Sequence, residues 1–205
     1  MFFTLTFAGL GLVGVVFFVN KARALDRRID DITDTPATAM GEVHGGLTEI
    51  DGSVSALSTT VLSPISKKPC VWYELHVEEY TGGKNKSWRT RIREKRYGTC
   101  IVEDDTGACE LAFERVEMML DRDTHTKAGS FDPAAPELQE ALAEYGFETK
   151  GWIFQKTIRC TETFLEVGDP VYALGHCTPR GDDFPVLTHY EGHALLVSDK
   201  GEESV

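Results

Sequence analysis

The chain has 205 residues, a formal net charge of -12 at pH 7 and a hydrophobic content of 41%. This length favours one folded domain with an appendage, and the negative charge argues against a nucleic-acid-binding surface, because a phosphate backbone attracts clustered lysine and arginine. The five cysteines are widely spaced and contain no Cys-x-x-Cys pair, which excludes a disulfide framework and a zinc ribbon. We therefore expect free, buried thiols and a reducing compartment around the domain; the residues are Cys70, Cys100, Cys109, Cys160 and Cys177.

The chain begins with an apolar segment. Residues 2–19 are apolar apart from two threonines, and this length reaches the lower limit for crossing a bilayer. We predict a membrane anchor over residues 1–20, with the lipid bilayer as a partner. A cleaved signal peptide is the alternative, because residues 22–24 resemble a cleavage site, although only Met1 precedes the apolar run. The large side chains of the predicted anchor include Phe2, Phe3, Leu10, Val16, Phe17 and Phe18.

Basic residues follow this segment directly, and no charged side chain precedes it. By the positive-inside rule, this asymmetry predicts a single-pass membrane protein with its N-terminus outside and its folded domain cytoplasmic. Residues 21–35 look like a short juxtamembrane helix that ends before Pro36. The basic residues are Lys21, Arg23, Arg27 and Arg28.

Residues 36–198 have the pattern of a mainly β domain. In the stretch over residues 63–80, Pro64 and Pro69 bracket a short turn. The residues after them alternate, with Trp72, Glu74, His76 and Glu78 on the face opposite Val71, Tyr73, Leu75 and Val77. This period of two predicts a strand with one core-facing side. Gly82-Gly83 predicts a hairpin turn that leads into a partner strand over residues 87–95.

The rest of the domain is predicted as short strands and turns. Glycines divide residues 43–54 into two short strands, and Asp104-Asp105-Thr106-Gly107 predicts a tight turn between strands over 100–103 and 108–113. Residues 121–136 look like a loop, and a helix is predicted over 136–145. Further strands are expected over 152–164, 171–177, 185–188 and 194–197, before a polar tail over 199–205. The pattern predicts a single β-barrel or sandwich-like domain with one inserted helix.

Four stretches, in this order, resemble the GIDE domain, also called the BAM (beside-a-membrane) domain. The first joins Thr35-Pro36 to residues 46–52, the second is residues 63–73 with residues 77–79, the third is residues 101–107, and the fourth joins Glu162 to residues 167–175. The resemblance covers residues 33–198 and implies a membrane-tethered module close to the bilayer, similar to the non-RING part of a mitochondrial family of RING ubiquitin ligases. The signature positions are Pro64, Pro69, Cys70, Trp72, Tyr73, Glu78, Asp104, Asp105, Gly107, Gly168, Asp169 and Gly175.

The chain departs from the ligase pattern in two respects. A RING finger needs eight Cys or His ligands in paired spacings, and no such set follows Val197. The second hydrophobic span of the ligase members has no counterpart after the domain either. We therefore expect no ubiquitin transfer by this chain alone.

Two kinds of chemistry stay open as alternatives. His176, Cys177, His189 and His193 form one candidate metal cluster, although Gly192 favours a turn between strands over a metal-binding helix. A cysteine–histidine nucleophile built on Cys70 or Cys177 needs a spatial adjacency that a sequence does not show. We predict no catalytic residue, no metal ligand and no cofactor. The aromatic residues Trp72, Tyr73, Trp88 and Tyr97 could form an exposed patch, but their alternation favours core or cross-strand positions.

The leading functional hypothesis is a non-enzymatic interaction or scaffold module at the cytoplasmic face of a membrane, for example in stress response or quality control. Its partner would be an unidentified protein and not a nucleic acid. The first alternative is a component of a RING-type ubiquitin-ligase system whose RING lies on another chain. The second alternative is a metal-dependent or Cys/His hydrolase.

Overall fold

The structure is a computed structural model that describes residues 35–82, 86–121, 124–128, 136–148, 157–181, 183–190 and 192–200. The predicted membrane anchor, all but the last residue of the predicted juxtamembrane helix, and residues 201–205 of the predicted tail lie outside these ranges. Within them, no helix combines the length and the apolar character needed to cross a bilayer.

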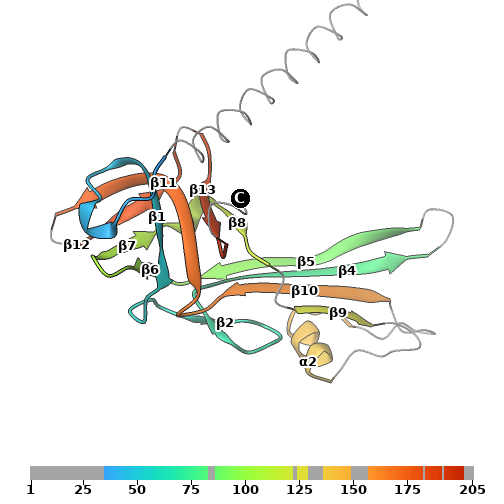
Figure 1. The fold of residues 1–205 in the computed structure, drawn as a ribbon. Coiled ribbons are helices and arrows are strands. Elements are labelled where there is room, and N and C mark those ends of the chain that lie inside the picture. The colour runs from blue at the N-terminus through green and yellow to red at the C-terminus, as the bar shows by residue number, and fades with distance from the viewer. Residues whose placement is uncertain are drawn as a thin grey trace, which may run out of the picture.

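Five strands form a closed barrel (Figure 1), and the prediction of a mainly β domain is confirmed. The hydrogen-bonded order is β1-β6-β7-β12-β11, and β11 pairs back with β1 from Gly46 opposite Cys177 to Ser53 opposite Pro170. Counted along the chain, these strands are the first, second, third, fifth and fourth of the barrel. The third and the fifth, β7 and β12, run parallel to each other. This is the connectivity of a five-stranded Greek-key barrel of the OB type. The strands are β1 (Gly46–Val54), β6 (Cys100–Glu103), β7 (Ala108–Leu111), β11 (Pro170–Arg180) and β12 (Asp183–Thr188).

Two more strands extend the barrel sheet. β13 (Leu195–Ser198) pairs antiparallel with residues 172–174 of β11, and β8 (Val116–Met119) lies parallel to β13. Two short 3-10 helices complete this part, η1 (Met40–Glu42) before β1 and η2 (Phe113–Arg115) before β8.

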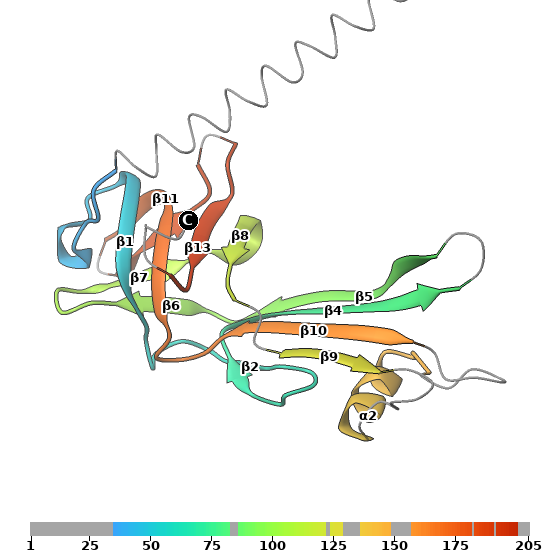
Figure 2. The same cartoon turned by 45° about the vertical axis from the view of Figure 1, so that its right-hand side comes forward.

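A second sheet of four strands projects from the barrel, in the order β5-β4-β10-β9 (Figure 2). It is made of two insertions into the barrel, because β4 and β5 lie between β1 and β6 along the chain, whereas β9 and β10 lie between β7 and β11. The two insertions meet where β4 pairs with β10, from Glu79 opposite Ile158 to Trp72 opposite Leu165. The strands are β4 (Trp72–Thr81), β5 (Ser87–Tyr97), β9 (Thr124–Ala128) and β10 (Ile158–Leu165).

The helix α2 (Pro136–Glu144) covers one face of the four-stranded sheet. Leu138 and Leu142 of the helix pack in one buried cluster with residues of β4 and β10, namely Leu75, Val77, Ile158 and Cys160. These contacts confirm the predicted helix and the core-facing side predicted for Leu75 and Val77. The strand itself begins only at Trp72, and residues 64–66 form a turn. The remaining short pair, β2 (Val61–Leu62) with β3 (Pro69–Cys70), precedes β4.

The barrel and the four-stranded sheet share a core at their junction. Val71, Trp72 and Leu165 of the sheet belong to the same buried cluster as Val102 and Val171 of the barrel. The Val71 N–H donates to the carbonyl of Leu165 at 2.7 Å. Burial of apolar surface at this junction therefore couples the two sheets.

Two predictions about strands are wrong, one at Gly52 and one in residues 121–136. Gly52 does not end a strand but lies inside β1, where an added Cβ would approach the Glu103 carbonyl oxygen to 2.6 Å, so the missing side chain permits close packing of β6. The predicted loop over residues 121–136 contains β9, which pairs with β10. A strand of such polar sequence is tolerated there because β9 is an edge of the sheet.

The turn at Asp104 is confirmed, and its carboxylate joins this turn to η1. One oxygen accepts hydrogen bonds from the Thr106 hydroxyl and from the backbone N–H groups of Thr106 and Gly107, and the other accepts the Met40 N–H at 2.9 Å. The hydrogen bond from the Thr106 hydroxyl, followed by that from Met40, lowers the pKa of Asp104 from the usual 3.8 to about 2. The neighbouring Asp105 is exposed and takes no part in this set.

This carboxylate predicts an acid-sensitive contribution to stability. Because the folded-state pKa lies below the unfolded one, the contribution is present above about pH 3.8 and is lost as the pH falls toward about 2. We expect the Tm of Asp104→Asn to lie below that of the unmodified protein at pH 5, and the two values to converge near pH 2. Thermal melts between pH 2 and 5 measure this, with Asp105→Asn as the matched control. A constant difference between Asp104→Asn and the unmodified protein across this range would contradict the prediction.

Candidate interaction surface

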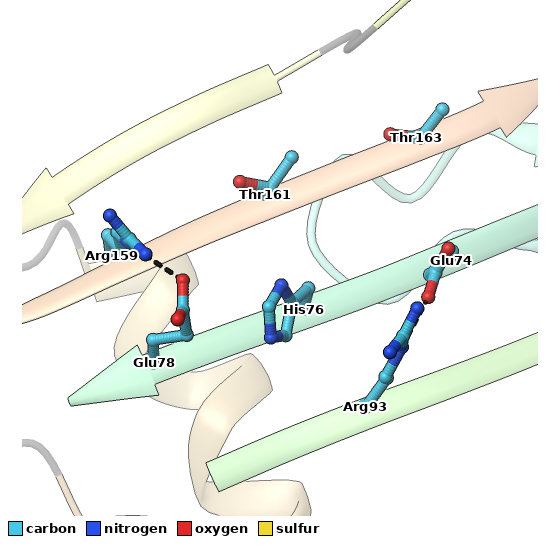
Figure 3. A pocket seen from close by; sticks show the side chains of 7 residues that line it. All are labelled: Glu74, His76, Glu78, Arg93, Arg159, Thr161 and Thr163. Atoms are coloured by element: carbon cyan, nitrogen blue, oxygen red, sulfur yellow. Dashed lines mark hydrogen bonds and ion pairs between the residues drawn. The ribbon is translucent and has the colours of Figure 1, made fainter. Parts of the chain in front are cut away.

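The face of the four-stranded sheet that α2 does not cover carries polar and charged side chains (Figure 3). Alternate side chains of three neighbouring strands, β4, β5 and β10, point to this side, because side chains along a strand alternate between its two faces. They line a depression of about 330 Å³, which we call the polar face. Its lining residues are Glu74, His76, Glu78, Arg93, Arg159, Thr161 and Thr163.

The strand register places these side chains in rows across the sheet. His76 of β4 lies opposite Thr161 of β10 and Arg93 of β5. Glu78 lies opposite Arg159 in one neighbouring row, and Glu74 lies opposite Thr163 in the other. Each of the three rows of the polar face therefore contains at least one charged residue.

Each carboxylate of the polar face is paired with an arginine. Arg93 Nε lies 2.7 Å from Glu74 Oε1, and Arg159 Nε donates to Glu78. The hydrogen bond to Glu78 raises the pKa of Arg159 above its usual value. His76 Nε2 lies 3.0 Å from the Thr90 hydroxyl. These pairs hold the long side chains in place, and they leave neither glutamate as an unpaired acid or base.

An aromatic pair closes one end of the polar face. The rings of Tyr80 and Trp88 lie across the β4–β5 ladder with centroids 5.3 Å apart, and the Arg159 guanidinium lies 4.4 Å from the Trp88 centroid. Trp72 and Tyr73, in contrast, are buried. The expectation that these aromatic residues occupy core and cross-strand positions is thus confirmed for Trp72, Tyr73 and Trp88, and Tyr97 packs edge-on against Phe113.

A buried carboxylate on the opposite face holds the loop between β2 and β3. Glu162 of β10 is fully buried. Its side chain accepts hydrogen bonds from the Ile65 N–H at 2.9 Å, the Ser66 N–H at 3.0 Å and the Ser66 hydroxyl at 2.5 Å. In the same loop, Lys67 has a φ of 53°, the one positive value of a non-glycine residue in the described part of the chain. The hydrogen bonds to Glu162 therefore hold this loop in one conformation against β10.

This loop borders a second, smaller depression of about 240 Å³. Pro64, Lys67, Tyr73, Arg96 and Tyr145 are among its lining residues. At its wall, the Tyr73 hydroxyl donates to Glu94 at 3.3 Å, and burial followed by the Glu94 charge raises the pKa of Tyr73 above its usual value.

The signature positions do not meet in one site. Glu78 alone lies on the polar face, while Pro64 and Tyr73 line the smaller depression. Asp104, Asp105 and Gly107 belong to the turn next to η1, and Pro69 and Cys70 form β3.

The last three signature positions have structural roles. Gly168 has a φ of +92° in the turn before β11, and Asp169 accepts the Glu166 N–H there at 2.7 Å. At Gly175 an added Cβ would approach the Thr188 carbonyl oxygen to 2.4 Å, so only glycine fits between β11 and β12. These positions shape turns and close contacts of the fold.

The sequence suggested part of the polar face. The alternation of Glu74, His76 and Glu78 was visible along β4, but their partners Arg159, Thr161 and Thr163 lie on a strand about 80 residues away, as the pairing of Glu78 with Arg159 shows. On β5, the spacing of Arg93 and Lys95 by two residues indicates that both side chains lie on one face of the strand.

The candidate metal and nucleophile residues lie apart from the polar face. His176 is exposed and the adjacent Cys177 is buried, so they point to opposite sides of β11. His189 comes directly before an isolated β-bridge between Tyr190 and His193, and Gly192 of the predicted turn lies between these two residues. Within the described ranges, no group of three His, Cys, Asp or Glu side chains is placed to hold a metal ion.

All five cysteines are free and buried, as predicted. Burial is the main cause that raises the pKa of Cys100, Cys109 and Cys160 to about 12, and it also raises the pKa of Cys177. Because the thiolate is the nucleophilic form, these four side chains are poor nucleophiles at neutral pH. Cys70 is fully buried beside the Val61 carbonyl.

In comparisons with protein-family models, with curated proteins and with solved structures, no match to this chain was found.

Proposed function

We propose that this chain is a non-enzymatic interaction module that binds a partner protein through its polar face and that its N-terminal segment holds it at the cytoplasmic side of a membrane. The observation that carries the proposal is the arrangement in Figure 3, where paired charges and hydroxyl groups line a depression on a sheet whose other face is covered by α2. Ordered ion pairs and an aromatic edge are suited to specific recognition of a protein surface.

The chemistry of the polar face supports binding over catalysis. General acid–base catalysis by two carboxylates needs one of them to act as a proton donor or acceptor, and both Glu74 and Glu78 are neutralised by arginine. Nucleophilic catalysis needs an accessible thiolate or an activated hydroxyl, and the raised pKa of Cys177 opposes the thiolate form. The membrane part of the proposal is supported by the sequence of residues 1–28.

The test is photo-crosslinking of the full chain in membranes, with a photoreactive amino acid at Thr163 and identification of the captured protein, followed by an affinity measurement with that protein. We expect Arg159→Glu to weaken binding by roughly tenfold or more, because it reverses a charge of the polar face and removes the contact with Trp88 at the aromatic end of this face. Arg180→Glu is the matched control, since Arg180 forms a similar ion pair with Glu110 on the barrel, 2.8 Å apart. Equal affinities of the two variants would reject the polar face as the binding site. A captured protein with a RING finger would connect the chain to ubiquitin transfer.

A further inference from the structure

Strand β5 is a long free edge of the four-stranded sheet. The order β5-β4-β10-β9 leaves β5 with one neighbour, β4, within the described residues. It runs for 11 residues and is mostly exposed. Because an antiparallel strand directs part of its N–H and C=O groups to each side, the outer side of β5 presents backbone groups that pair with no other strand of the described residues and can bind another extended segment.

The charge of this edge is opposite to that of the chain as a whole. Residues 86–97 contain six lysine or arginine residues and one glutamate, whereas the chain has a net charge of -12. Acidic side chains of β4 hold some of these cations on the inner side, as in the pairs of Arg91 with Glu79 at 2.8 Å and of Arg93 with Glu74 at 2.7 Å. Both arginines are more than 40% exposed, and a guanidinium has five N–H donors, so each arginine can also contact a carboxylate of a partner.

A β-bulge limits where a new strand can pair. The β4–β5 register shifts between Val77 and Glu78, which leaves Arg91 as the extra residue of β5. Bulges twist an edge and interrupt pairing. The regular part of the edge is therefore residues 92–97, about 20 Å long at about 3.3 Å per residue.

We propose that residues 92–97 accept an extended acidic segment of a partner protein as a fifth strand of the sheet. This inference rests on the interaction role proposed above and adds the chemistry of the partner. The charges decide between the possible occupants. Pairing with β5 of a second copy would bring Arg93, Lys95 and Arg96 close to the same three cations of that copy, which is unfavourable for like charges across a ladder. An acidic strand places carboxylates there instead and gains both backbone hydrogen bonds and opposite-charge pairs.

The experiment uses the full chain in lipid nanodiscs and a fluorescent eight-residue peptide that alternates glutamate and valine. Two further versions of this peptide carry N-methyl groups on one or the other set of alternate amides. Strand addition predicts that one methylated version loses binding, because its methyl groups replace the N–H donors that face β5, and that the other binds within about twofold of the unmodified peptide. Fluorescence anisotropy measures the affinities. Equal binding of both methylated versions would show charge attraction without strand pairing and would overturn the proposal, as would failure of the unmodified peptide to bind.

Protein variants separate this inference from the proposed function. The double variant Arg93→Glu/Lys95→Glu should weaken peptide binding by roughly tenfold or more, and Arg159→Glu should leave it unchanged, because Arg159 lies on β10, two strands from the edge. A peptide whose glutamates are replaced by lysine should not bind. If Arg159→Glu abolishes capture of the membrane partner but the acidic peptide does not bind β5, the interaction role stands and the strand addition is wrong.

Discussion

Replacing Trp72 by alanine is expected to lower the free energy of unfolding by about 3–5 kcal/mol. The indole is 1% exposed and packs in the cluster that joins the four-stranded sheet to the barrel, so its removal leaves a cavity at the junction of both. Urea unfolding followed by circular dichroism measures the change. The indole N–H has no acceptor within the described residues, so Trp72→Phe loses packing without leaving a polar partner unpaired and should cost less than half as much.

Trp88→Ala is the matched control for this prediction. Trp88 lies on the same hairpin but at its partly exposed end, where it packs against Tyr80 and Arg159. We expect it to cost about 1 kcal/mol or less, in the range of an aromatic cross-strand pair. Similar losses for Trp72→Ala and Trp88→Ala would contradict the shared core at the junction. The burial of Trp72 and Tyr73 also means that alanine variants at these positions report on folding and cannot serve as binding-site variants.

Replacing Glu162 by alanine is expected to lower the free energy of unfolding by about 3 kcal/mol, because it leaves the Ile65 N–H, the Ser66 N–H and the Ser66 hydroxyl without their acceptor. Glu162→Gln keeps one oxygen and should lose about half of that amount. Hydrogen exchange would locate the effect, with faster exchange in residues 63–69 than in the barrel strands.

Glu110→Gln is the matched control, since Glu110 forms an exposed ion pair with Arg180 and should change stability little. If Glu162→Ala unfolds at the same urea concentration as Glu110→Gln, the loop does not depend on the buried carboxylate. The signature stretch over residues 63–73 and Glu162 belong to two separate stretches of the sequence that carry the resemblance. Their contact gives a physical reason for their joint presence.

Local patterns in the sequence predicted the elements whose signals are local. The alternation from Val71 to Val77 predicted the buried side of β4, and the two glycines at positions 82 and 83 predicted its pairing with β5. Asp104 to Gly107 predicted a turn that the structure confirms. Residues 124–128 were missed because an edge strand needs no apolar face, and Gly52 was misread because a glycine at a close contact looks like a glycine in a turn.

Long-range register could not be predicted. Closure of the barrel depends on the pairing of Gly46 with Cys177, and the polar face depends on the pairing of His76 with Thr161. No local pattern specifies which residues of two distant strands become neighbours, because each strand offers several registers that keep its apolar face inside. The half of the polar face on β4 was therefore foreseeable, and the half on β10 was not.

The interleaved insertions have a consequence for how the chain acquires its structure. Neither sheet is formed by a continuous piece of sequence, since β4 pairs with β10 and β1 pairs with β11, both of which come much later in the chain. Such high contact order slows folding. Until residues 158–177 have been synthesised, the hairpin of β4 and β5 exposes its apolar side to solvent. We therefore expect slow, single-step refolding, and a strong dependence on chaperones during synthesis, when the early strands wait for their late partners.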